Sequence, residues 1–352
     1  MHPTDIVRFE FPTRYKRLVL ALAFPTVLFV FGCGHVQRQP AGAANGDPML
    51  NGDHVLTADG YRLPLRRWLP RGEIKAVVLG LHGFNDYGNA FHYLQEAVVD
   101  AGHVAIYAYD QRGFGATKRP GIWAGTETLV NDARTVTNLL RARYPHRPLF
   151  LMGESMGASV VLLALAEGNS LPADGAVLIA PAVWGTDAMP WYQRLGLWLA
   201  VRMMPGKYFS SETVRRMGKR ATDDSEIIRE LSNDPLVLKG ARVDTLHGVS
   251  ELMLEASRVV SVRIPSQTLY GLNDHIIPSE PVCNWLRRLT QSPPTGMRIV
   301  LYPGGYHMLT RYSERAKVIA DIAAWLRSTR SILPSGYESS LDEARAMVCA
   351  KA

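Results

Sequence analysis

The stretch LMGESMGASV, residues 151–160, places a serine between two glycines in the pattern G-x-S-x-G. An apolar run precedes Ser155 and a second apolar run with helical spacing follows it, which predicts a strand, a sharp turn and a helix. Gly153 and Gly157 leave room for the neighbouring chain at this turn. The helix directs the positive end of its dipole at Ser155 and makes the Met156 N–H a candidate oxyanion donor. Ser155 is therefore the candidate nucleophile.

A serine hydroxyl becomes a nucleophile when a base accepts its proton and a carboxylate orients that base. Two downstream segments supply these groups just past predicted strands: YGLNDHIIP carries Asp274 and YPGGYHML carries His307. The carboxyl ends of parallel strands meet at one edge of a sheet, so both side chains are expected near Ser155. The loop LHGF adds a second candidate oxyanion donor, the Phe84 N–H, while His82 in this loop is expected to be structural.

The rest of the chain alternates between short apolar runs and amphipathic helical patterns. Strands are predicted at 54–70 (two runs around a D-G turn), 75–83, 103–115, 148–157, 175–182, 266–274 and 298–307. Helices are predicted at 92–102, 126–145, 158–168 and 315–327. This alternation predicts an α/β fold with a mostly parallel central sheet and helices on both of its faces.

Residues 184–255 interrupt the alternation with a mainly helical block, which we interpret as a cap inserted above the sheet of one domain spanning 53–330. Trp191, Leu195 and Trp198 form one apolar helical face in this block. That face either packs on the sheet domain, or it lines an acyl-chain tunnel or contacts a membrane.

The N-terminus has the pattern of a targeting segment. A basic stretch, RYKR, precedes the apolar run LVLALAFPTVLFVF, which is short for a membrane span of about 20 residues. The following VFGC resembles a bacterial lipobox. This implies a signal peptide at 1–32, lipidation of Cys33, and a membrane-anchored lipoprotein of the bacterial cell envelope that faces the periplasm or the exterior. Residues 33–52 are expected to form a flexible tether. The alternative is an ordinary signal peptide or an uncleaved anchor with an incidental cysteine.

Composition excludes several other classes of protein. The formal charge of +7 is spread without a basic run interleaved with aromatics, so no nucleic-acid partner is expected. No group of cysteines and histidines has the spacing of a zinc site, so no metal is expected. The sequence leaves open whether Cys283 and Cys349 form a disulfide or two thiols. The last segment, 331–352, is polar and is expected to be a peripheral tail.

Taken in order, the segments HGF, DQRGFG, GESMG, GLNDHIIP and GGYHML resemble the motifs of α/β-hydrolases, and more narrowly those of the monoacylglycerol lipase and lysophospholipase branch. The resemblance covers residues 54–328 and includes NDPLVLKGARVDTLHGVSELM, which leads out of the cap in that branch. It implies the α/β-hydrolase fold and no cofactor. The nucleophile, acid, base and two backbone oxyanion donors that it implies are Ser155, Asp274, His307, Phe84 and Met156.

The chain departs from this branch in one loop. Where the branch often has a glycine, an acidic residue and a second histidine, this chain has Asn85, Asp86 and Tyr87. The loop borders the acyl pocket in the branch, so the departure bears on the choice of substrate. Asp110 and Arg112 in DQRGFG are expected to fix the loop beside the site and to have no catalytic role.

The expected activity is hydrolysis of acyl esters, of monoacylglycerols or lysophospholipids, through an acyl-enzyme on Ser155. A serine nucleophile excludes the epoxide hydrolases and haloalkane dehalogenases of the same fold, which use an aspartate. The partners are then a lipid or small acyl ester and a membrane that holds the lipid anchor. A short-chain carboxylesterase, a thioesterase and an amidase stay open as alternatives. So does a non-catalytic lipoprotein binding module, which predicts a broken triad.

Overall fold

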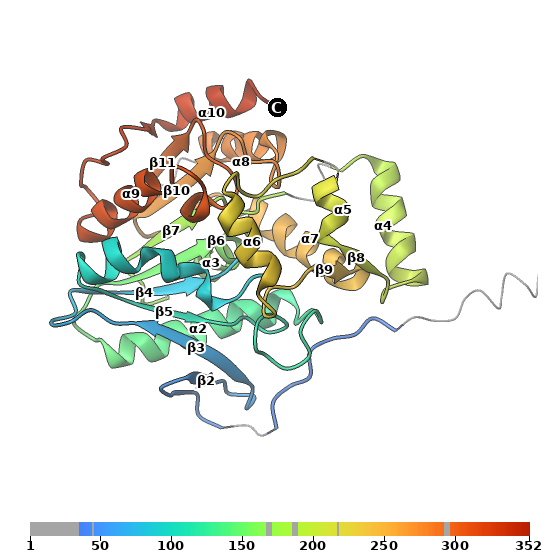
Figure 1. The fold of residues 1–352 in the computed structure, drawn as a ribbon, viewed down its shortest axis with the longest axis horizontal. Coiled ribbons are helices and arrows are strands. Elements are labelled where there is room, and N and C mark those ends of the chain that lie inside the picture. The colour runs from blue at the N-terminus through green and yellow to red at the C-terminus, as the bar shows by residue number, and fades with distance from the viewer. Residues whose placement is uncertain (1–34, 44–45, 167–170, 185–188, 217, 292–295) are drawn as a thin grey trace, which may run out of the picture.

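The computed structural model describes residues 35–43, 46–166, 171–184, 189–216, 218–291 and 296–352 of the chain (Figure 1). The predicted signal peptide and Cys33 lie outside these residues, so cleavage and lipidation stay predictions. The prediction of a flexible tether at 33–52 is wrong where the structure describes it, because Met49–Leu50 pairs with a neighbouring strand and an earlier part is bonded to the body. Gln39 makes this earlier contact. Its backbone N–H donates to Trp123 O at 3.1 Å, and its side-chain amide donates to Ile122 O at 3.0 Å.

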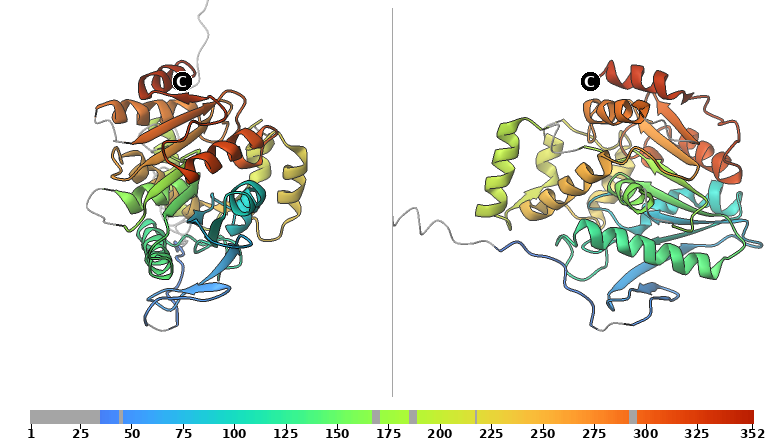
Figure 2. Two further views of the ribbon diagram at one scale, coloured as in Figure 1. Left: turned by 90° about the vertical axis from the view of Figure 1, so that its left-hand side faces the viewer. Right: turned by 180° about the vertical axis from the view of Figure 1, so that it is seen from behind.

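Ten of the described strands form one twisted sheet through the centre of the molecule (Figures 1 and 2). They are β1 (Met49–Leu50), β2 (His54–Leu56), β3 (Arg62–Trp68), β4 (Ala76–Leu81), β5 (Val104–Tyr109), β6 (Leu149–Glu154), β7 (Gly175–Ile179), β10 (Ser266–Gly271), β11 (Met297–Tyr302) and β12 (Glu338–Ser339). Their order in space is β1-β2-β3-β5-β4-β6-β7-β10-β11-β12. Neighbours from β5 to β11 run parallel and the outer pairs run antiparallel, which confirms the predicted mostly parallel sheet.

Helical segments cover both faces of the sheet, because the central strands are nearly continuous apolar runs that must be buried on both sides. In β4, Val77 and Leu79 enter one hydrophobic core and Val78 enters the other. The first core is covered by α2 (Thr126–Arg143), α3 (Met156–Leu165), α7 (Val243–Ser257), α8 (Ser279–Gln291) and α10 (Leu341–Cys349). The second is covered by η1 (Gly88–Leu94), η2 (Gln95–Asp100) and α9 (Arg315–Arg327).

The helix predicted at 92–102 differs in kind from an α-helix. The chain forms a 3₁₀ helix, η1, followed by a π-helical turn, η2, in which the Ala101 N–H reaches Glu96 O at 3.0 Å. The change in winding keeps Leu94 and Val98 buried on the same face of the sheet.

The cap block consists of α4 (Trp191–Met203), β8 (Tyr208–Ser210), α5 (Ser211–Arg216), α6 (Ser225–Asn233) and β9 (Gly240–Arg242). The strands β8 and β9 pair antiparallel, which the helical pattern of the sequence did not predict. The helix α7 follows β9 and packs against α2 and α3, so it belongs to the helical layer of the sheet domain. Figure 1 shows α4 at the outer edge of this block.

The helix α4 contacts α7, but none of its side chains is fully buried. Trp191 is 73% exposed, and Leu195 and Trp198 are also exposed. The alternative in which this apolar face packs on the sheet domain is therefore wrong. No helix among the described residues has the length and apolarity needed to cross a bilayer.

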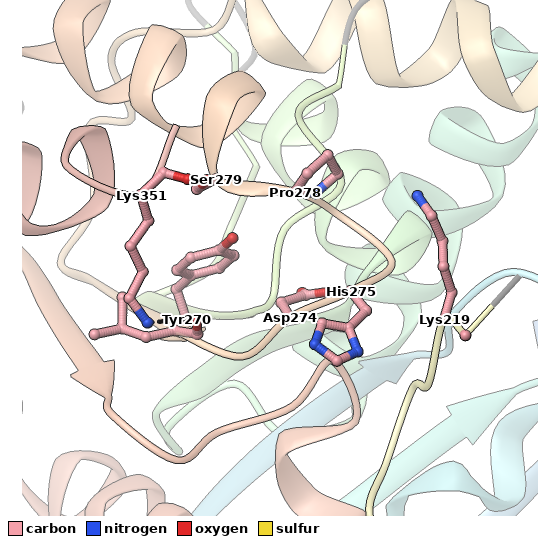
Figure 3. A pocket seen from close by; sticks show the side chains of 9 residues that line it. Lys219, Tyr270, Asp274, His275, Pro278, Ser279 and Lys351 are labelled. Carbon is pink, nitrogen blue, oxygen red and sulfur yellow. Dashed lines mark hydrogen bonds between the residues drawn. The ribbon is translucent and has the colours of Figure 1, made fainter.

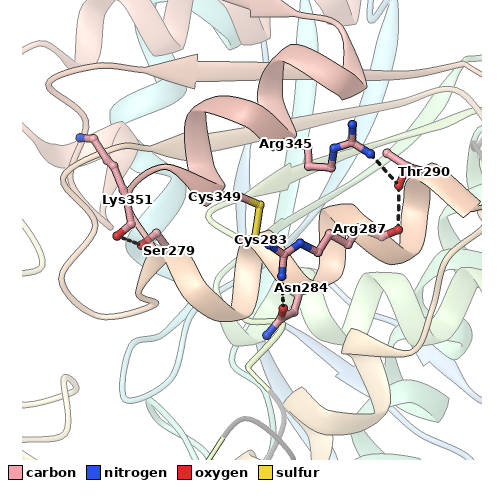
Figure 4. The surroundings of a disulfide bond; sticks show 8 residues. All are labelled: Ser279, Cys283, Asn284, Arg287, Thr290, Arg345, Cys349 and Lys351. Carbon is pink, nitrogen blue, oxygen red and sulfur yellow. Dashed lines mark hydrogen bonds between the residues drawn. A yellow bond between two sulfur atoms is a disulfide. The ribbon is translucent and has the colours of Figure 1, made fainter.

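The segment 331–352 is part of the folded body, and the prediction of a peripheral tail is wrong here. β12 extends the sheet beside β11, and α10 packs on α8. Ala344 and Val348, one turn apart on α10, are fully buried, while the apolar residues Ala346 and Met347 between them are exposed, so apolar spacing does not mark the buried face of this helix in the sequence. A disulfide joins Cys283 of α8 to Cys349 of α10 (Figure 4). Closing this loop of 66 residues stabilises the fold by about 4 kcal/mol.

Candidate active site

The candidate nucleophile lies where the strand order of the sheet reverses. The strand β4 has β5 on one side and β6 on the other, and the segments after β4 and β6 cover opposite faces of the sheet. A crevice forms at such a point, beyond the carboxyl ends of the strands. Ser155 directly follows β6, and the loop of residues 82–84 directly follows β4. The chain connectivity therefore places both loops at one crevice.

The backbone of Ser155 adopts the strained conformation of a nucleophile elbow, with φ 53° and ψ −115°. The Ser155 N–H donates to Ile179 O at 2.8 Å and holds the turn to β7. A Cβ on Gly157 would overlap Leu81 O, and one on Gly153 would overlap the backbone of α3. Both glycines are thus required by close contact between backbones, as the sequence predicts.

Ser155, His307 and Asp274 form one continuous chain of hydrogen bonds. Ser155 Oγ lies 2.9 Å from His307 Nε2, and His307 Nδ1 lies 2.7 Å from Asp274 Oδ2. An ionised carboxylate only accepts hydrogen bonds, so Nδ1 carries the ring proton and Nε2 is free to accept from the serine. The structure therefore brings together the three side chains that the sequence singles out, in the protonation state that base catalysis needs.

The acid loop fixes the orientation of Asp274. The other carboxylate oxygen, Oδ1, accepts from the backbone N–H groups of Ile276 at 2.8 Å and Ile277 at 2.9 Å. Burial disfavours a charged His307 ring, but the charge and hydrogen bond of Asp274, with a further contribution from Glu154, outweigh it and raise the pKa of His307. The ring is thereby made a stronger base than a free histidine.

The loop after β4 packs against the elbow. A Cβ on Gly83 would lie 3.5 Å from the Ser155 Cβ, so the backbone that carries the Phe84 N–H passes directly beside the nucleophile. His82 is fully buried, its Nδ1 donates to Gly83 O at 2.8 Å, and its Nε2 accepts from the Gln111 N–H at 2.9 Å. Both ring nitrogens are occupied and burial lowers the pKa of His82, so this histidine is structural.

In the loop after β4, Asn85 stands where the lipase branch described above often has a glycine, and it adopts a turn conformation that suits glycine. Asn85 has φ 65°, a conformation that glycine adopts freely and that asparagine tolerates best among the other residues. Its carbonyl accepts from the Leu238 N–H at 2.9 Å, and Tyr87 Oη donates to Asp234 Oδ2 at 2.5 Å. The loop is therefore bonded to the segment between α6 and β9, at the end of the cap.

Asp110 and Arg112 are structural, as expected. Asp110 accepts from the Gly88 N–H at 2.9 Å and from Arg66 at 2.6 Å. Arg112 is buried and bridges Asp59 and Asp132, with a closest contact of 2.6 Å. Neither side chain contacts the serine or the histidine of the site, and together they hold the loop after β5.

A cavity of about 380 Å³ adjoins the acid loop (Figure 3). Lys219 of the cap lines one side and Lys351, just after α10, lines the other, with His275 between them. Lys351 is held in place because its Nζ donates to Leu272 O at 3.0 Å and its carbonyl accepts from Ser279 Oγ at 2.6 Å. The cavity wall therefore carries two lysines beside the carboxylate of Asp274. Within the described part of the chain, no cluster of histidine, cysteine and acidic side chains could hold a metal ion.

The family model for serine aminopeptidases of group S33 (Hydrolase_4) matches residues 72–314. The chain belongs to this family. Among curated relatives, it is 26% identical over 278 residues to the monoacylglycerol lipase of Mycolicibacterium smegmatis, covering 76% of this chain and 94% of that protein. It is 24% identical over 298 residues to the monoglyceride lipase of Homo sapiens, covering 82% of this chain and 95% of that protein.

Two solved structures of lipases share the fold. A soluble variant of the Saccharomyces cerevisiae monoglyceride lipase, solved with a substrate analogue, aligns with a TM-score of 0.65 at 20% identity over 84% of this chain and all of that one. The monoacylglycerol lipase of Paleococcus ferrophilus aligns with a TM-score of 0.60 at 20% identity, over 76% of this chain and 98% of that one. These structural matches confirm the predicted α/β-hydrolase fold. The family model and the curated lipases show the predicted enzyme class, a carboxylic ester hydrolase.

A buried cluster of ion pairs lies next to the candidate site, and the sequence analysis did not predict it. Arg311, four residues after His307, binds Asp86 of the loop after β4 and Glu154 at the end of β6. Glu154 lies in the GESMG segment, but the sequence around it does not indicate which residue it pairs with. Only the fold shows that an arginine 157 residues later reaches it.

Proposed function

We propose that the protein is a serine ester hydrolase that cleaves acyl esters of lipids through an acyl-enzyme on Ser155. The observation that carries this proposal is the chain of hydrogen bonds from Ser155 through His307 to Asp274, at 2.9 and 2.7 Å. An intact triad also argues against a non-catalytic binding module, which would have no reason to keep it.

The proposed reaction follows from the geometry. His307 Nε2 accepts the Ser155 proton as Oγ attacks the ester carbonyl, and Asp274 stabilises the imidazolium that forms. The N–H groups of Phe84 and Met156 donate to the oxyanion. His307 then protonates the leaving alcohol, and a water molecule deprotonated by the same ring releases the acid from Ser155.

The proposed substrates are monoacylglycerols, with lysophospholipids as the second candidate. The names of the curated relatives support the first class, since this chain spans more than nine tenths of the mycobacterial and human lipases. The two lysines of the cavity beside the acid loop, Lys219 and Lys351, support the second class, because they would attract a phosphate headgroup.

A panel of substrates with one acyl chain and different headgroups tests this proposal. We expect the wild type to hydrolyse both monoolein and oleoyl lysophosphatidylglycerol. Lys219→Met is expected to lower kcat/KM for the anionic lipid about fivefold and to leave that for monoolein unchanged, because only the phosphate loses a partner. Lys75→Met is the matched control, because Lys75 directly precedes β4 and so lies at the amino ends of the parallel strands, away from the site at their carboxyl ends. Turnover of short p-nitrophenyl, thioester or amide substrates alone would instead indicate one of the other acyl hydrolases.

We further propose that the cap contacts a lipid surface. Large apolar side chains are exposed on α4 and β8, a surface we call the α4–β8 face: Trp191, Tyr192, Leu195, Trp198, Leu199, Met203, Tyr208 and Phe209. Arg202 lies 3.8 Å from the Trp198 ring centroid, and such a pairing of cation and indole suits the headgroup region of a bilayer.

The path of the N-terminal chain supports the same orientation. The Gln37 N–H donates to Asp244 Oδ2 at 3.2 Å, and the Asp244 N–H donates to Pro205 O at 3.0 Å, just after α4. The chain thus leaves the body on the side of α4 and β8 (Figure 1). A lipid on Cys33, and the envelope location that we propose with it, would bring this side to a membrane. The Cys283–Cys349 disulfide is consistent with that oxidising location.

Vesicles that contain brominated phospholipids test the membrane contact. The seven tryptophans of the chain all lie outside the N-terminal apolar run, so quenching reports on the folded body alone. We expect brominated vesicles to quench the emission of the wild type, and replacement of both Trp191 and Trp198 by phenylalanine to remove most of this quenching. Trp68→Phe, a half-buried tryptophan in β3, is the control. Unchanged quenching in the double variant would contradict the proposed orientation.

A further inference from the structure

A buried ion-pair cluster joins the two loops that carry the proposed oxyanion donors. The Arg311 side chain is 2% exposed and forks between two carboxylates. Nη1 donates to Asp86 Oδ2 at 2.6 Å and Nη2 donates to Glu154 Oε2 at 2.6 Å. We call these three residues the Arg311 cluster. The rigid, planar guanidinium fixes the distance between its two partners more tightly than a flexible lysine could.

The two carboxylates belong to the backbone segments whose relative position sets the geometry of the proposed oxyanion donors. Asp86 lies two residues after Phe84, and its N–H donates to Gly83 O at 3.2 Å within the same turn. Glu154 is the last residue of β6 and directly precedes Ser155. The fork of Arg311 therefore spans from the loop after β4 to the elbow, the two places from which the Phe84 and Met156 N–H groups come.

The backbone of Arg311 extends the link to the cap. Thr222 Oγ1 donates to Arg311 O at 2.7 Å, and the Met308 N–H donates to Ala221 O at 2.8 Å. The cap segment between α5 and α6 is thus bonded to the short turn η4 (Leu309–Arg311) that follows His307. One turn of the chain holds the histidine loop, the oxyanion loop, the elbow and the cap together.

The charges of the cluster also bear on the reaction. Two carboxylates and one guanidinium leave a single net negative charge in a region closed to water. Without Arg311, two buried negative charges would remain in the segments that carry the proposed oxyanion donors, and an oxyanion formed near them would be destabilised. The positive charge of Arg311 opposes the burial that raises the pKa of Glu154, and so helps to keep this carboxyl ionised.

We propose that Arg311 is a positioning residue for ester hydrolysis, which holds the oxyanion loop against the nucleophile elbow and offsets the charges of Asp86 and Glu154. The inference rests on the proposed esterase chemistry, which wild-type turnover of p-nitrophenyl butyrate tests separately.

The test compares Arg311→Met and Arg311→Lys with a matched control in the full chain. Arg311→Met is expected to lower kcat about 100-fold with KM changed less than threefold, because oxyanion contacts form only in the transition state. Arg311→Lys keeps the charge and is expected to recover about tenfold of this loss. Arg298→Met breaks another forked pair, with Glu338 at the far edge of the sheet, and should cost stability while kcat stays within threefold of wild type.

A pH profile of Glu154→Gln separates positioning from a loss of packing. The charged groups that face His307 are Asp274, Glu154 and Arg311, and Glu154 raises the pKa of His307. Its removal is expected to move the acidic limb of kcat/KM to lower pH. The proposal is overturned if folded Arg311→Met keeps kcat within threefold of Arg298→Met. If Arg311→Met does not fold, unchanged kcat in Arg311→Lys together with an unmoved limb in Glu154→Gln overturns it.

Discussion

Replacing Ser155 with alanine is expected to lower kcat for p-nitrophenyl butyrate by about 10⁴- to 10⁶-fold, with little change in KM. The variant loses the hydroxyl that lies 2.9 Å from His307 Nε2, while the surfaces that bind substrate are unchanged. No acyl-enzyme can then form, and any residual rate comes from the oxyanion donors alone. The same variant is expected to lose all labelling by a fluorophosphonate probe, which reacts only with an activated serine.

Ser159→Ala is the matched control for this prediction. Ser159 lies one turn further along α3, is fully buried, and donates through Oγ to Ala182 O at 2.7 Å. Its replacement removes a hydrogen bond and is expected to lower the free energy of unfolding by about 1 kcal/mol, with kcat within threefold of wild type and labelling intact. Labelling that survives in Ser155→Ala, or activity within tenfold of wild type, would sink the assignment of the nucleophile.

The fold and the location of the candidate site follow from local patterns in the sequence. Strand and helix alternation predicts a parallel sheet, and strand ends predict where Ser155, Asp274 and His307 lie. The elbow was predictable because its glycine pattern, the strand before it and the helix after it are adjacent in the sequence, although Gly157 is required by a contact with Leu81 of β4. The gap of 33 residues between Asp274 and His307 is bridged by two adjacent strands, β10 and β11, whose carboxyl ends lie together.

Features that depend on distant contacts could not be predicted in this way. The Arg311 cluster joins residues 86, 154 and 311, and nothing in the sequence near any of them indicates the pairing. The disulfide between Cys283 and Cys349 depends on the docking of α10 on α8, which buries Ala344 and Val348. The sequence does not distinguish these two residues from Ala346 and Met347, which are exposed on the same helix. The exposure of α4 is also a tertiary property, since an apolar helical face looks the same in sequence whether it is covered or not.

The second large effect is expected for Asp274→Asn, and it follows from how the acid loop holds this side chain. Oδ1 accepts two backbone N–H groups, from Ile276 and Ile277, so an asparagine must place its carbonyl oxygen there. Its NH₂ group then faces His307 Nδ1 and donates to it. The imidazole proton is forced onto Nε2, which can no longer accept from Ser155. We expect kcat to fall about 10⁴-fold, or about 5.4 kcal/mol in transition-state free energy.

The prediction for Asp274→Asn also includes the direction in which the acidic limb of the pH profile moves. The pKa of His307 is raised in the wild type, against the effect of burial, chiefly by the charge and hydrogen bond of Asp274. The acidic limb of wild-type kcat/KM is therefore expected above pH 6.5, with activity lost as the pH falls through it. In Asp274→Asn, burial dominates and the limb should move to lower pH.

Asp321→Asn controls for the loss of a buried carboxylate. Asp321 is fully buried in α9 and accepts from Tyr302 Oη at 2.7 Å and from the Ser335 N–H at 2.9 Å. A hydroxyl can reverse its role and accept from an amide, so this variant should keep kcat within threefold and an unmoved limb. An acidic limb that stays in place in Asp274→Asn, or a fall in kcat no larger than that of Asp321→Asn, would contradict the prediction. Asp274 would then neither orient the His307 ring nor raise its pKa.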